Sequence, residues 1–120
     1  MEKSKIDVAV KTLSDEIAAA TSHAKNLDMA ITIRKQTVNR LASDIRGLKT
    51  LRRKLNQEGA STRYLDGLLL HIVGDYNTHV SILPTLKQRH HEALEEIYLK
   101  GLILKELGHV GGVQGCTDGE

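Results

Sequence analysis

The chain has 120 residues, which allows a single domain with a small core. It contains three Tyr, no Phe and no Trp, so any core must be built from Leu, Ile, Val and Ala. A single Cys excludes an internal disulfide and a multi-cysteine zinc site, and the net charge of +2 is modest.

The first predicted element is a long helix over about 5–56. Apolar residues recur there at alternating steps of four and three: Ile6, Val10, Leu13, Ile17, Ala20, Ala24, Leu27, Ile31, Val38, Leu41, Ile45, Leu48 and Leu55. This spacing, without proline, predicts a coiled-coil seam. Arg34 and Arg52 fill the two interrupted seam positions, where a polar residue can fix register and partner choice. Each of these arginines has two interpretations. It forms an ion pair with a carboxylate of a neighbouring chain, or its charged head extends to the edge of the bundle.

A turn is predicted at about 57–61 and a second helix at about 62–108. Gly59 suits a left-handed C-cap, and Ser61 or Thr62 suits the start of the next helix. The second seam reads Leu65, Leu69, Ile72, Tyr76, His79, Leu83, Leu86, His90, Leu94, Ile97, Gly101 and Leu104. Its steps from 86 to 90 to 94 predict a stutter, where the supercoil unwinds.

The two patterns match when the chain folds back near residue 60, because this places Ile45 opposite Tyr76. We therefore predict an all-α fold: a long antiparallel helical hairpin of coiled-coil type, over residues 1–109, assembled into a multi-helix bundle. Pro84 removes a backbone donor, so the second helix is kinked or broken near it. Residues 110–120, which include Cys116, are predicted to form a flexible Gly-rich tail.

The second helix carries more apolar residues than one seam uses. A surplus apolar face of this kind is typical of a protein interface, and self-association would cover it. The predicted partner interface consists of Leu68, Leu70, Val73, Val80, Leu99, Leu102 and Ile103. A protein partner, and a homo-oligomer that is a dimer or higher, are therefore expected.

A basic stripe suggests a second function. Residues 34–54 carry eight Lys or Arg against one Asp. Fixed cations at helical spacing suit the phosphates of a nucleic acid, although no aromatic residue is interleaved to stack bases. The predicted contacts are Lys35, Arg40, Arg46, Lys49, Arg53, Lys54 and Arg63. A solvated charged face and a docking surface for an acidic protein are the other interpretations.

Sequence signals for chemistry are weak. His71, Asp75 and His79 are spaced by one helical turn and form a weak candidate metal site, but buried or boundary histidines fit the pattern better. No motif of an enzyme or a cofactor is present, and a catalytic or metal site between helices is a third, minor hypothesis.

No segment has the length and apolarity of a membrane span or a signal peptide, so we expect a cytoplasmic protein with no membrane contact. The sequence favours a non-enzymatic interaction module acting as adaptor, chaperone, inhibitor or assembly factor.

Overall fold

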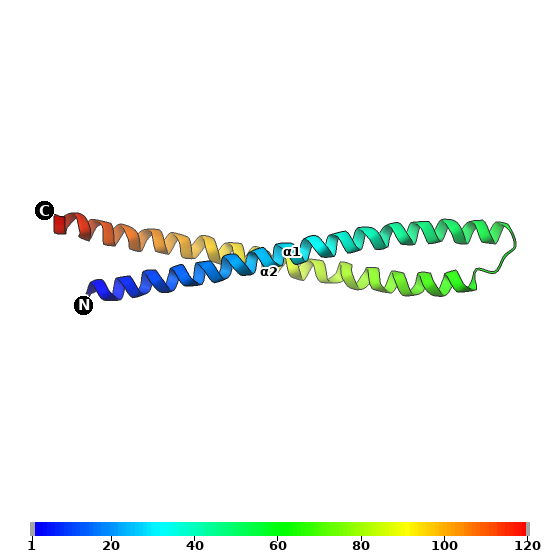
Figure 1. Cartoon of the computed structure of the whole chain (residues 1–120), viewed down its shortest axis with the longest axis horizontal. Helices are drawn as coiled ribbons and strands as arrows, with labels where there is room; N and C mark the ends of the chain where they lie inside the picture. Colours follow the sequence, from blue (N-terminus) through cyan, green and yellow to red (C-terminus); the bar gives the residue numbers. More distant parts are fainter. Residues whose placement is uncertain (1, 120) are drawn as a thin grey trace. The chain divides into compact units, whose positions relative to one another are not determined.

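The computed structural model describes the backbone of residues 2–119 and the side chains of residues 5–110. Two helices, α1 (Glu2–Gln57) and α2 (Arg63–Gly119), are joined by a short turn (Figure 1). Between residues 2 and 119 there is no strand. The chain is an all-α antiparallel helical hairpin, as the heptad spacing predicts.

The turn is built by the residues that the sequence assigns to it. Gly59 has φ of 75°, in the left-handed region that favours glycine. The amide of Gly59 donates to the Asn56 carbonyl at 3.1 Å, and the amide of Ala60 donates to the Leu55 carbonyl at 2.9 Å. This pair of bonds is the Schellman arrangement, which satisfies the last carbonyls of α1. At the start of α2, the Ser61 hydroxyl accepts the Arg63 amide at 3.4 Å.

Helix α2 continues through Pro84 without interruption. The predicted break near Leu83 is therefore wrong, while the kink stays a prediction. A proline in a helix leaves one carbonyl of the preceding turn without its amide partner, and the surrounding turns of α2 tolerate this loss.

The far end of α2 also differs from the predicted boundary. The helix reaches Gly119, whereas the sequence places its end near residue 108. The side chains of residues 111–120, Cys116 among them, lie outside the described residues. The mobility of that segment stays a prediction.

The seam of α1 is confirmed at every predicted position, but the seam of α2 differs at two, where Ala93 replaces Leu94 and Lys100 replaces Gly101. Leu94, which the sequence assigns to the seam, is 48% exposed, and its neighbour Ala93 is 5% exposed. The steps through Leu86, His90, Ala93 and Ile97 therefore keep the regular alternation of four and three. The predicted stutter is wrong because a small alanine, rather than the larger leucine, takes the core position.

Helix packing divides the chain into two units. The terminal unit combines Met1–Asp28 with Gln88–Glu120, and the turn unit spans Met29–Lys87. In the terminal unit the buried apolar side chains are Ala20, Ala24, Leu27 and Ala93, and in the turn unit they are Ile31, Leu65 and Leu69. None of the described side chains is fully enclosed. Each unit thus has a thin core, and alanines dominate that of the terminal unit.

Candidate functional site

Polar residues of the seam meet polar partners on the other helix. In the turn unit, Arg34 Nη1 lies 2.8 Å from His79 Nδ1. A guanidinium can only donate, so the imidazole accepts at Nδ1 and carries its proton on Nε2. The predicted seam position of Arg34 is therefore confirmed, and its partner belongs to the same chain. A polar pair inside an apolar seam opposes any slip of one helix along the other.

Arg52, the second arginine of the seam, lies close to the turn. Its Nη1 atom is 3.5 Å from Asp66 Oδ1, and both side chains are about half exposed. Asp66 stands in the first turn of α2, where a carboxylate also interacts favourably with the helix dipole. The Thr62 hydroxyl donates to the same carboxylate at 3.2 Å. This contact links the end of α1 to the start of α2.

Lys100 is another polar residue of the seam, at a position that the sequence pattern assigned to its neighbour Gly101. Its ammonium lies 3.1 Å from Glu96 on α2 and 3.5 Å from Glu16 on α1, within the terminal unit. The hydrogen bond to Glu96 raises the pKa of Lys100 above its ordinary value of 10.5, desolvation opposes this, and the charges of Glu16 and Glu96 add to the rise. The spacing of Glu96 and Lys100 by one helical turn is the signal that identifies the contact in the sequence.

A hollow of about 440 Å³ lies beside Lys100 in the terminal unit. Its lining residues are Glu16, Ala19, Ala20, His23, Arg89, Glu92, Ala93, Glu96 and Lys100. The hollow exists because Ala19, Ala20 and Ala93 are too small to fill the space between the helices. It is open and lined by both charges, so it resembles a gap in thin packing more than an enclosed ligand site.

The weak candidate metal residues are not brought together. His71 Nε2 and Asp75 Oδ2 are 4.0 Å apart on the exposed side of α2, while His79 is hydrogen-bonded to Arg34. Among residues 5–110, no three His, Cys, Asp or Glu side chains gather closely enough to hold a metal ion. His79 is therefore a seam histidine that is hydrogen-bonded to the other helix.

Most of the predicted partner interface is open to solvent. The exposed members are Leu70, Val80, Leu99, Leu102 and Ile103, whereas Leu68 and Val73 are half-buried beside the seam. On α1 the structure also exposes Met29 and Ile33, which are not among the predicted interface residues. Their spacing by one helical turn outside the seam is the pattern that identifies them.

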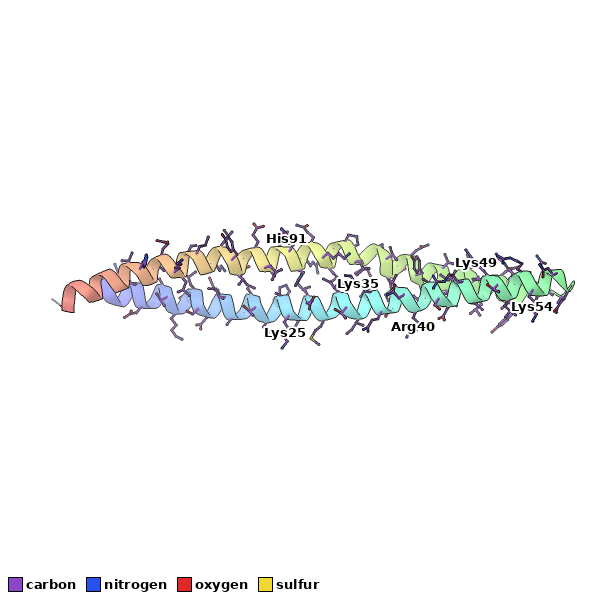
Figure 2. All side chains as sticks on the ribbon, turned by 90° about the horizontal axis from the view of Figure 1, so that it is seen from above. Lys25, Lys35, Arg40, Lys49, Lys54 and His91 are labelled. Carbon is purple, nitrogen blue, oxygen red and sulfur yellow. The ribbon has the colours of Figure 1, made fainter. Side chains whose placement is uncertain are left out.

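The predicted basic contacts are exposed around much of the outer surface of α1 in the turn unit. This broad basic face consists of Lys35, Arg40, Arg46, Lys49, Arg53 and Lys54, and Arg63 is exposed at the start of α2. Figure 2 shows the side chain of Arg40 pointing away from α2. Within the described residues, none of these seven side chains makes an ion pair, in contrast to Arg52 and Lys100. Their charges are therefore available to an external anion.

Comparison with known proteins gives no relative: no protein-family model, curated protein or solved structure matches the chain. In the part of the chain that the structure describes, neither helix has a stretch long and apolar enough to cross a membrane.

Proposed function

We propose that the chain is a non-enzymatic protein-interaction module that self-associates through apolar side chains of α2. The observation that supports this most is the contrast between a thin core and a well-populated exposed apolar surface. Leu70 is 78% exposed, and Leu99, Leu102 and Ile103 are each about half exposed. Exposed side chains of this size are typical of surfaces that partners cover.

Assembly would bury apolar surface that a single hairpin leaves in water. Covering each half-exposed side chain among Leu99, Leu102 and Ile103 contributes about 1 kcal/mol. A hairpin with few buried side chains gains proportionally more from this contribution than a protein with a large core. The proposal includes a role as adaptor, chaperone, inhibitor or assembly factor, a cytoplasmic location, and a dimer or larger oligomer.

The test is light scattering coupled to size-exclusion chromatography at micromolar concentration. The wild-type chain is expected to elute as an oligomer, and Leu99→Ser combined with Leu102→Ser is expected to shift it toward the monomer. Val8→Ser, which changes an exposed apolar residue of α1, is the control and should keep the wild-type mass. A wild-type chain that is monomeric and captures no protein partner would overturn the proposal.

A second candidate function is nucleic-acid binding by the basic face of α1. Six cations without an ion-pair partner favour it, because fixed cations release counterions from phosphates on binding. Fluorescence anisotropy with labelled duplex and single-stranded DNA is the measurement. Arg46→Glu with Arg53→Glu should weaken binding strongly, and affinity should fall steeply as salt rises. Lys25→Glu reverses one charge on α1 outside the basic face. It is the matched control for a single reversal, such as Arg46→Glu alone. Binding that ignores both the reversals and the salt would rule this function out.

A further inference from the structure

Two surface stripes lie outside the seam and share one spacing. The α1 stripe consists of Met29, Ile33, Gln36 and Arg40, and the α2 stripe consists of Glu92, Glu96, Leu99 and Ile103. In each stripe the residues follow at steps of four, three and four. This is the spacing that lets one helix pack along another. All eight side chains are exposed.

The α1 stripe has an apolar beginning and a basic end. Met29 is 53% exposed and Ile33 is 60% exposed, so their apolar surfaces are largely open to solvent. Arg40 lies two turns beyond Ile33 and makes no ion pair within the described residues. The stripe thus presents an apolar patch followed by an uncompensated positive charge.

The α2 stripe has an acidic beginning and an apolar end. Leu99 is 49% exposed and Ile103 is 51% exposed. They line a shallow hollow of about 380 Å³ together with Glu92, Glu95, Glu96 and Lys100. Glu96 is engaged by Lys100, whereas Glu92 has only a 3.4 Å hydrogen bond from Gln88. An apolar hollow with a weakly held carboxylate at one end is the complement of the α1 stripe.

We propose that a second copy of this chain docks its α1 stripe antiparallel onto the α2 stripe. The antiparallel direction places Ile33 against Leu99 and Arg40 against Glu92, and it places Met29 beside Ile103. A parallel direction would instead set Met29 and Ile33 against the two glutamates, which would lose their water without a partner. The inference rests on the proposed self-association and specifies its surface.

The charges of the two units favour the same arrangement. The turn unit, which holds the α1 stripe, has ten Lys or Arg and four Asp or Glu. The terminal unit, which holds the α2 stripe, has seven and eleven. Copies therefore attract when the turn unit of one meets the terminal unit of the other, and they repel when like units meet. This complementarity is the reason to expect a second copy as the occupant.

A charge-exchange experiment tests the proposal by sedimentation equilibrium. Arg40→Glu and Glu92→Arg should each weaken association about tenfold, because each places like charges together in the interface. The double variant carries the same pair in reversed order and should recover wild-type association. Arg53→Glu makes the same change in the net charge of the turn unit but lies outside the stripe, so it should weaken association much less than Arg40→Glu. Circular dichroism establishes that each variant keeps its helices.

A cross-linking experiment tests the register independently. With Cys116 replaced by Ser, a mixture of Ile33→Cys and Leu99→Cys chains should form an inter-chain disulfide under air oxidation. A mixture of Ile33→Cys and Val80→Cys chains should not, since Val80 lies outside the α2 stripe.

The outcomes separate this inference from the proposed function. If Arg40→Glu and Glu92→Arg each associate as the wild type does, and Ile33→Cys cross-links no better with Leu99→Cys than with Val80→Cys, the docking surface is overturned. Self-association itself then stays in place. A wild-type chain that stays monomeric overturns both.

Discussion

Arg34 donates from Nη1 to Nδ1 of His79 at 2.8 Å, across the seam of the turn unit. Both residues are partly buried, so removing one leaves the other without its partner in a place where water has limited access. We expect His79→Leu to lower the free energy of unfolding by about 1–2 kcal/mol, because the guanidinium loses its acceptor. Thermal and urea unfolding followed by circular dichroism measure this change.

Three variants give the controls for that measurement. His79→Gln keeps an acceptor oxygen and should lose less stability, while His71→Leu changes an exposed histidine on the same helix and should have little effect. Replacing Arg34 and His79 together by Leu should recover the stability lost in His79→Leu, because no polar group then remains unpaired. Equal stabilities of His79→Leu and His71→Leu would show that the seam contact contributes nothing.

The corrected seam makes a prediction about two neighbouring residues of α2. Ala93 is buried and Leu94 is about half exposed. We expect Ala93→Asp to destabilise the hairpin by about 2–4 kcal/mol, because it places a charge in the seam, and Leu94→Asp to change stability by less than about 1 kcal/mol. Urea unfolding of the two variants compares them directly. The reverse order of stabilities would restore the stutter and place Leu94 in the core.

The sequence predicts the hairpin well because its signals are local and repeated. The α1 seam, Gly59 at the turn and the placement of Ile45 with Tyr76 follow from spacing alone, and the last two residues do line one hollow. Hydrophobicity alone predicts the wrong seam residue at this point of α2. It favours Leu94 because leucine is larger and more apolar, whereas the regular heptad step favours Ala93.

Side-chain pairing is harder to predict than the seam. The spacing places Arg34 in the seam, but its partner depends on the axial offset between the helices, and an error of a few residues in the fold-back point moves the expected partner by about two turns. The register from the turn suggests a partner near residue 86 for Arg34, and the structure pairs it with His79. Met29 and Ile33 share a one-turn spacing outside the seam, but they have no partner within one chain, so the structure is needed to show that they are exposed.

Replacing glycine by alanine should change the stability of the hairpin in opposite directions at two positions. Gly59 adopts φ of 75° in the turn, where an added Cβ is strained even though no atom lies near it. We expect Gly59→Ala to destabilise by about 1 kcal/mol. Gly47 lies on the exposed side of α1 with open space around its Cα, so Gly47→Ala should stabilise by about 0.5–1 kcal/mol through helix propensity. Melting temperatures that move the same way in both variants would contradict the role assigned to Gly59.

The Lys100 contact should make stability depend on pH in the alkaline range. Because the hydrogen bond to Glu96, with the charges of Glu16 and Glu96, raises the pKa of Lys100 above 10.5, the folded state holds this proton more tightly than the unfolded state. The contribution is fully present below pH 10.5 and is lost as the pH rises through the higher pKa of the folded state. Lys100→Met keeps the apolar stem and removes the charge. It should therefore lower the melting temperature at neutral pH, and its difference from wild type should shrink above pH 10.5.

The matched control is Lys105→Met, which removes an exposed lysine that makes no ion pair within the described residues. Its melting temperature should stay close to that of wild type at neutral pH. All chains are compared at one protein concentration, because self-association shifts apparent stability by mass action. A melting-temperature difference between wild type and Lys100→Met that is constant across this range would mean that Lys100 contributes through the packing of its stem. The ion pairs with Glu16 and Glu96 would then have no part in holding the terminal unit together.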